Sequence, residues 1–124
     1  MDTDYSNEII GAAIEVQRVL GVGLLESAYV AALCVELSER GIPFETQVPI
    51  VGHYKGRPLG VALRADLIVA ESVIVEVKAV DADLAVYRAQ LLSYLRLSGL
   101  KLGLLMNFHA GSVAKSVHRV VNKL

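Results

Sequence analysis

The chain has 124 residues, 54% of them hydrophobic, and a formal net charge of −1. This length supports one domain with one core, residues 1–124, and the high apolar content excludes a disordered chain. The near-zero net charge excludes a general attraction to DNA or RNA, so any affinity for nucleic acid requires a local basic patch. The apolar excess also indicates a covered surface, which is compatible with a homodimer.

The sequence offers little sign of a membrane or of cysteine chemistry. No apolar run approaches the roughly 18 residues of a bilayer-spanning helix. The first residues, Met-Asp-Thr-Asp-Tyr-Ser, are acidic and polar, unlike a signal peptide, so we expect a cytoplasmic protein. Cys34 is the only cysteine, which excludes an internal disulfide. His53, His109 and His118 lack metal-ligand spacing, and we interpret them as ordinary polar residues.

Helices are predicted at the start of the chain and strands after it. Apolar residues recur at helical spacing over 7–20, and Gly21-Val22-Gly23 ends that helix. A second helix is expected from about 25 to 40. The remaining predicted elements are strands over 44–54, 59–69 and 73–80, a helix ending near Ser98, a strand over 100–107 and a helix over 112–122. This order predicts an α/β (α+β) fold with a four-stranded mixed sheet flanked by helices. Pro49 indicates either an edge position for the first strand or a bulge in it.

Glu76 follows Asp66 by ten residues and Lys78 follows it by twelve, and all three lie in strand-like sequence. If the strands form a hairpin around Ala70-Glu71-Ser72, Asp66 lies directly opposite Glu76, and Lys78 follows on the face of Glu76. Paired carboxylates repel each other, and a divalent cation is the simplest means of offsetting that repulsion. The pattern therefore indicates a metal-dependent phosphodiester-cleaving site. The alternative is a solvated strand face with a cross-strand salt bridge.

Two helical residues are candidates for the same site. Glu26 shares a helix face with Tyr29, so it points inward and needs a partner or a metal. Alternatively, Glu26 only favours the helix dipole from the first turn. Gln90 lies four residues before Tyr94, on a helix face that could be directed toward the carboxylates. Alternatively, Gln90 is a surface amide next to a core tyrosine.

These residues lie in four of five ordered sequence blocks. The blocks are Gly23-Leu24-Leu25-Glu26-Ser27-Ala28-Tyr29, Arg64-Ala65-Asp66-Leu67, Val75-Glu76-Val77-Lys78-Ala79, Ala89-Gln90-Leu91-Leu92-Ser93-Tyr94-Leu95 and Gly103-Leu104-Leu105-Met106-Asn107-Phe108. Over nearly its full length the chain resembles the GxxExxY proteins, a group of the PD-(D/E)XK nuclease superfamily. The resemblance implies a restriction-endonuclease-like αβββαβ core. One departure is Ala65, where the superfamily name has a proline, but this position carries no ligand.

The resemblance also implies a cofactor and a role for each site residue. The implied cofactor is Mg²⁺ or Mn²⁺, and its implied ligands are Asp66, Glu76, the carbonyl of Val77 and Glu26. The implied catalytic residues are Lys78, which orients or activates the attacking water, and Glu26 and Gln90, which support the site.

Contacts with a phosphate backbone require positive charge. Lys115 and Arg119 share one face of the predicted last helix, and Lys55, Arg57 and Arg64 add charge on the sheet. The alternative for the last helix is a solvated charged face. The sequence thus predicts a Mg²⁺-dependent nuclease that hydrolyses DNA or RNA, with no membrane partner. The alternative function is an inactive module of the same fold that binds nucleic acid or a protein.

Overall fold

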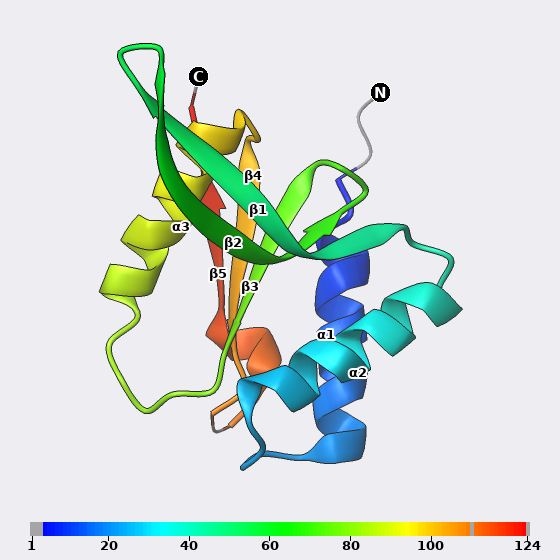
Figure 1. Cartoon of the computed structure of the whole chain (residues 1–124). Helices are drawn as coiled ribbons and strands as arrows, with labels where there is room; N and C mark the ends of the chain where they lie inside the picture. The colour runs from blue at the N-terminus through cyan, green and yellow to red at the C-terminus, as the bar shows by residue number, and fades with distance from the viewer. Residues whose placement is uncertain (1–3, 110, 124) are drawn as a thin grey trace.

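The computed structural model describes residues 4–109 and 111–123, apart from the side chains of residues 61 and 62. Figure 1 shows helices packed on a twisted sheet. The elements are α1 (Ser6–Leu20), α2 (Glu26–Glu39), β1 (Phe44–Tyr54), β2 (Arg57–Val69), β3 (Val73–Lys78), α3 (Ala85–Ser98), β4 (Leu102–Asn107), the 3-10 helix η1 (Val113–Ser116) and β5 (Val117–Val121).

The sheet has five strands in the order β1-β2-β3-β4-β5. The β3–β4 pair is parallel and the other pairs are antiparallel, so the prediction of a mixed sheet flanked by helices is confirmed. The predicted number of four strands is wrong. Strand β1 lies at an edge, one of the two alternatives that Pro49 indicated, because proline cannot donate a ladder hydrogen bond.

The fifth strand replaces the predicted last helix. Residues 112–122 form η1 and then β5, which pairs with β4 from Leu102–Val121 to Met106–Val117. The apolar spacing at Val113, Val117 and Val120 fits a helix, but β-branched residues also fit a strand, and the free edge of β4 offers backbone partners. The strand therefore forms because of a pairing that is distant in the sequence.

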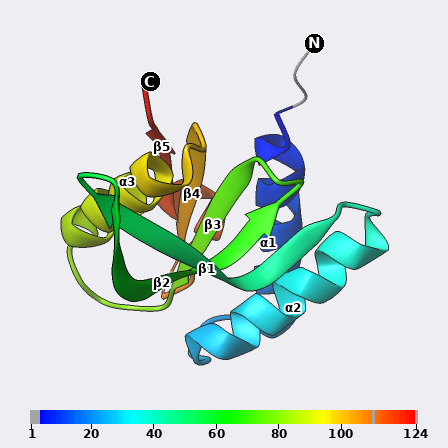
Figure 2. The same ribbon diagram turned by 45° about the horizontal axis from the view of Figure 1, so that its top comes forward.

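Two apolar clusters hold the helices against opposite faces of the sheet. Helices α1 and α2 cover one face and α3 covers the other, as Figures 1 and 2 show. Strand β3 alternates between them: Val75 packs with α1 and α2, whereas Ile74 packs with α3. By the same alternation Glu76 lies on the α3 side. Within the described ranges, no helix is long and apolar enough to cross a membrane.

Candidate active site

The predicted carboxylates lie where strands β2 and β3 separate. Backbone pairing between these strands ends at Leu67 and Val75. At the next position the Asp66 N–H donates to Oε2 of Glu76 at 2.7 Å, and the Val77 N–H donates to Oδ2 of Asp66 at 2.8 Å. At this position, hydrogen bonds from backbone N–H groups to the two carboxylates therefore replace the backbone-to-backbone bonds of the ladder. Each carboxylate accepts one such bond from the opposite strand.

Burial makes both of these carboxyl groups harder to ionise. Burial, followed by the charge of Asp66, raises the pKa of Glu76 to about 7, and this side chain is only 5% exposed. Burial also raises the pKa of Asp66, to which the charge of Glu26 adds, while the Val77 N–H and the charge of Lys78 oppose the rise. The charge of Lys78 thus offsets only part of the cost of two ionised carboxylates.

The donor atoms suit a hard divalent cation. Each carboxylate has one oxygen engaged by a backbone N–H, whereas Oδ1 of Asp66 and Oε1 of Glu76 accept no hydrogen bond from the described residues. Mg²⁺ is usually bound by one or two carboxylates and keeps several waters. Within residues 4–109 and 111–123, no group of three or more His, Cys, Asp or Glu side chains is placed to hold a metal ion. The residues therefore fit a two-carboxylate, water-rich site.

Lys78 lies beside the carboxylates on the α3 side of the sheet. Its Nζ atom is 4.7 Å from the centroid of the Tyr87 ring, a cation–π contact that holds the side chain against α3. The Lys78 charge lowers the pKa of Asp66 and of Glu76, so the ammonium group acts on both carboxylates. Lys78 is thereby held near the carboxylates without being a ligand.

The face of α3 that looks toward the carboxylates presents Tyr94. Burial, with the charges of Glu76 and Asp66, raises the pKa of the Tyr94 hydroxyl, which is consistent with its lying near them. The sequence marked this helix face through Gln90, yet Gln90 is exposed and forms no hydrogen bond with the described part of the chain. Tyr94 is therefore the residue that α3 turns toward the site, and the supporting role of Gln90 stays a prediction.

The spacing Gly-x-x-Glu-x-x-Tyr has a structural explanation in the loop before α2. Gly23 has φ 100°, a backbone conformation that favours glycine. The Tyr29 hydroxyl donates to the Gly21 carbonyl at 2.8 Å and accepts from the Leu24 N–H at 3.2 Å. The Tyr29 ring stacks on Phe108 with centroids 4.5 Å apart. The glycine shapes the loop and the tyrosine ties it to the core.

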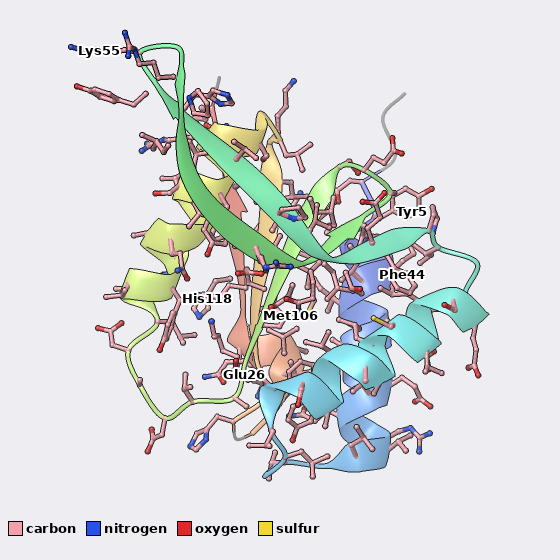
Figure 3. All side chains as sticks on the ribbon, in the orientation of Figure 1. Tyr5, Glu26, Phe44, Lys55, Met106 and His118 are labelled. Atoms are coloured by element: carbon pink, nitrogen blue, oxygen red, sulfur yellow. The ribbon has the colours of Figure 1, made fainter. Side chains whose placement is uncertain are left out.

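Glu26, the first residue of α2, is connected to the end of β3. Its Oε2 atom accepts a hydrogen bond from the Ala79 N–H at 3.2 Å, and its charge raises the pKa of both Asp66 and Glu76. Figure 3 shows Glu26 at the start of α2, beside the central strands. Glu26 is half-buried and has a specific backbone partner, so it does more than favour the helix dipole. A direct role in metal binding stays a prediction.

Tyr29→Phe is expected to lower the free energy of unfolding by about 1 kcal/mol, because it removes two hydrogen bonds and keeps the ring stack. Urea denaturation measures the change. Tyr5→Phe is the matched control, since the Tyr5 hydroxyl forms no hydrogen bond within the described residues, and its effect should stay within about 0.5 kcal/mol. Equal losses in the two variants would contradict the proposed anchoring of the loop.

Gln47 is a residue near the site that the sequence did not reveal. The β1–β2 register brings Gln47 opposite Asp66, where the ladder skips a pair, and Gln47 has φ 51°. A glutamine in this left-handed region is uncommon, and such residues cluster at functional sites. Gln47, Glu26 and Asp66 line one pocket between α2 and β1. In the sequence Gln47 reads only as one more polar residue of an alternating strand.

The basic residues predicted to contact phosphate do not come together on one helix. Lys115 lies in η1 and Arg119 in β5. Arg119 donates to the Ser6 hydroxyl at 2.8 Å and forms an ion pair with Asp4. The hydrogen bonds from Ser6 and Arg119 lower the pKa of Asp4 to about 2. Arg119 thus ties β5 to the start of α1, whereas Arg64 is exposed on β2.

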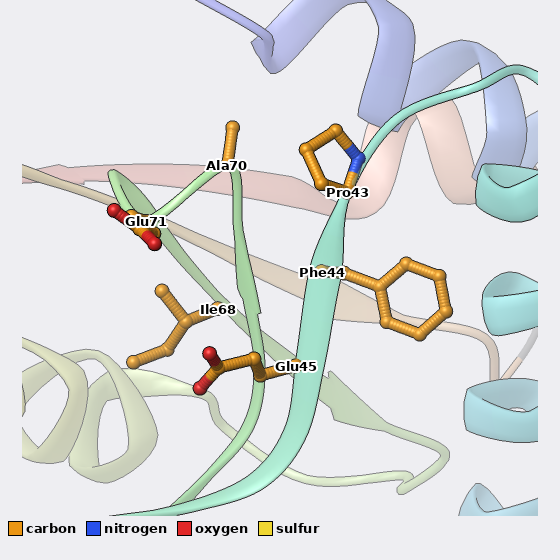
Figure 4. Close-up of a pocket in the computed structure, with 6 residues that line it drawn as sticks. All are labelled: Pro43, Phe44, Glu45, Ile68, Ala70 and Glu71. Carbon is orange, nitrogen blue, oxygen red and sulfur yellow. The ribbon is translucent and has the colours of Figure 1, made fainter.

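A separate pocket lies at the start of β1. Figure 4 shows it beside the turn after β2, with Phe44 directed away from Ile68. The lining residues are Pro43, Phe44, Glu45, Ile68, Ala70 and Glu71. Because the lining includes neither Asp66 nor Glu76, this pocket is not part of the carboxylate site.

The sheet and its carboxylate pair are the features of a class of nuclease folds, and comparison with known families agrees. The sequence matches the model of the PD-(D/E)XK nuclease superfamily over residues 3–120. The chain belongs to this superfamily. Nucleases of the superfamily generally use divalent metal ions. The superfamily match does not distinguish the GxxExxY proteins from other members.

A solved structure titled "Crystal structure of SSO0001" has the same fold. It superposes with a TM-score of 0.56 at 16% sequence identity, and the match covers 98% of this chain and 79% of that chain. At this identity the likeness concerns the fold alone. No curated protein matches the sequence.

Proposed function

We propose that this chain is a metal-dependent nuclease that hydrolyses phosphodiester bonds in DNA or RNA. The observation that supports this proposal most is the reciprocal pair of Asp66 and Glu76 at the point where β2 and β3 separate. A structural role alone gives little reason to bury two carboxyl groups with raised pKa values side by side. A divalent cation offsets their charge and explains why both are present.

Each residue of the site has a proposed role. Asp66 and Glu76 would hold Mg²⁺ or Mn²⁺, and the Val77 carbonyl and Glu26 would be further donors, direct or through water. A bound divalent cation supplies Lewis-acid activation of the phosphodiester and of water. Lys78 orients the attacking water and offsets the negative charge that develops in the transition state.

The finer family assignment is a second part of this proposal. Gly23 shapes the loop before α2, Tyr29 ties that loop to the core and Glu26 connects the start of α2 to the end of β3, which supports placing the chain among the GxxExxY proteins. Gln90 is proposed to support the site once substrate is bound. A cytoplasmic location and a homodimer stay predictions.

An inactive module that binds nucleic acid or a protein is the alternative function. The net charge of −1 favours the protein-binding form of this module, because most proteins that bind nucleic acid tightly carry a clear basic excess. The intact pair of carboxylates and the adjacent Lys78 favour the nuclease, since an inactive module has no use for their mutual repulsion.

Cleavage assays test the proposal directly. Wild type is expected to cleave at least one of single-stranded or double-stranded DNA or RNA in Mg²⁺ or Mn²⁺, and none in EDTA. Asp66→Ala should reduce cleavage by about 10²-fold or more, because it removes a cation ligand. Glu45→Ala, at an exposed carboxylate of β1, is the matched control and should retain wild-type activity.

Two results would contradict the proposal in different ways. Absence of cleavage on every substrate, together with absence of Mn²⁺ binding by calorimetry, would contradict the nuclease function. Wild-type activity in Asp66→Ala would contradict the assignment of the site. Circular dichroism of each variant separates a loss of activity from a loss of fold.

A further inference from the structure

The β1–β2 hairpin forms a two-stranded arm that extends beyond the rest of the sheet. Figures 1 and 3 show its tip, with Lys55, projecting past the end of α3. Lys55 and Gly56 have φ values of 51° and 78°, as a type I′ turn requires, and this turn matches the twist of the two strands. We define the arm as residues 49–64, which end two residues before Asp66.

The first strand of the arm is packed against the body of the protein as far as Gly52. A Cβ atom on Gly52 would lie 3.5 Å from Leu97 of α3, so the arm and the helix are in close contact there. Ile50 and Tyr94 belong to the same buried cluster. The arm is therefore a fixed projection whose outer part is free for a partner, and its direction is set by α3.

The arm carries positive charge without any acidic residue. Residues 46–65 contain Lys55, Arg57 and Arg64 but no Asp or Glu. The whole chain has a net charge of −1, so the residues outside this segment sum to −4, which is −1 minus +3. All three basic residues are exposed, and none forms an ion pair with the described residues. This uncompensated charge is complementary to an anionic partner.

The tip of the arm also presents exposed apolar and aromatic side chains. Tyr54 is 62% exposed, and the Nζ atom of Lys55 lies 5.4 Å from the centroid of its ring. Val51 and Leu59 are 52% and 55% exposed. A hairpin that carries both exposed apolar and exposed basic side chains suits a partner that offers base edges in a groove and phosphates on its walls.

We propose that the arm docks in the major groove of double-stranded DNA, with Lys55, Arg57 and Arg64 contacting phosphates. This inference rests on the proposed function, since the same duplex would be the substrate of the carboxylate site. The major groove of B-form DNA, about 12 Å wide, admits a two-stranded β-ribbon, whereas the deep and narrow major groove of duplex RNA does not. Single strands are bound by a row of stacking aromatic residues, and Tyr54 is the one aromatic residue of the arm.

Binding of a fluorescent 24-base-pair DNA duplex, measured by anisotropy in EDTA, tests the inference without cleavage. The double variant Lys55→Glu/Arg57→Glu is expected to bind about 10-fold more weakly or worse, and the slope of log Kd against log salt should fall by about 2, because two phosphate contacts are lost. The matched control is Lys101→Glu/Lys123→Glu, which makes the same charge change at exposed positions outside the arm. It should change Kd less than 2-fold if binding is local to the arm.

Several outcomes would overturn the inference. Equal losses in the arm variant and the control would show that only net charge matters. Equally tight binding of wild type to duplex RNA or to single-stranded DNA would exclude the proposed substrate class. No binding to any nucleic acid would assign the arm to a protein partner instead. Since this assay contains no metal, its failure is separate from a failure to hydrolyse DNA in Mg²⁺, which would count against the nuclease itself.

Discussion

Lys78→Ala is expected to slow single-turnover cleavage by about 10²–10³-fold while leaving cation binding nearly unchanged. The Lys78 ammonium lies over the Tyr87 ring and lowers the pKa of Asp66 and Glu76, so it acts on the site through its charge. It is no metal ligand, because an ammonium group has no lone pair to donate. Its removal therefore affects the transition state far more than the bound cation.

The comparison with Asp66→Asn separates the two roles. This variant keeps the size of the side chain but loses its charge, so Mn²⁺ binding by calorimetry and cleavage should fall together. Lys101→Ala, at an exposed lysine outside the site, is expected to leave both quantities at the wild-type level. A loss of Mn²⁺ binding in Lys78→Ala as large as that in Asp66→Asn would show that Lys78 organises the carboxylates and does not act on substrate.

The carboxylate pair was predictable from local sequence because one short turn sets its register. Ala70 and Glu71 both have positive φ, and Ser72 donates its N–H to the Val69 carbonyl at 3.0 Å, which closes the predicted hairpin. Once this turn is fixed, strand alternation places Asp66 opposite Glu76. Adjacent strands joined by a tight turn need no information from distant parts of the chain.

Features that depend on distant contacts were not predictable in the same way. The residues of β5 form a strand because the edge of β4 offers backbone partners. The local pattern of apolar residues carries no information about that edge. Gln47 takes its unusual conformation where the β1–β2 ladder lacks the pair between Gln47 and Asp66, a property of two strands together. Tyr94 was placed on the correct helix face, but only the packing of α3 shows that it, and not Gln90, is buried there.

Without divalent metal, the protein is expected to be less stable at pH 8 than at pH 5, and Glu76 is the main reason. Its pKa is about 7 in the folded state, against an ordinary value of 4.5, so the folded state binds the proton more tightly. The stabilisation from protonated Glu76 is fully present below pH 4.5 and is lost as the pH rises through 7. A difference of about 2.5 pKa units corresponds to at most about 3 kcal/mol of unfolding free energy.

Other groups do not reverse this trend. Asp66 has a raised pKa and acts in the same direction. Asp4 acts oppositely, because its pKa is lowered to about 2, but its contribution changes only below about pH 4, outside the range compared. Urea denaturation at pH 5 and at pH 8 in EDTA measures the difference. Glu76→Gln should remove most of it, and Glu45→Gln, at an exposed carboxylate, should not.

Addition of Mg²⁺ or Mn²⁺ extends the same argument to the metal site. A cation binds the ionised carboxylates, so it should raise the melting temperature more at pH 8 than at pH 5, where protons compete for the same oxygens. The extra stabilisation should disappear in Glu76→Gln and persist in Glu45→Gln. If the free energy of unfolding of the wild type does not change between pH 5 and pH 8, burial does not disfavour the ionised form of Glu76. Equal metal stabilisation in wild type and Glu76→Gln would place the cation elsewhere, because a neutral amide cannot replace the charge that binds it.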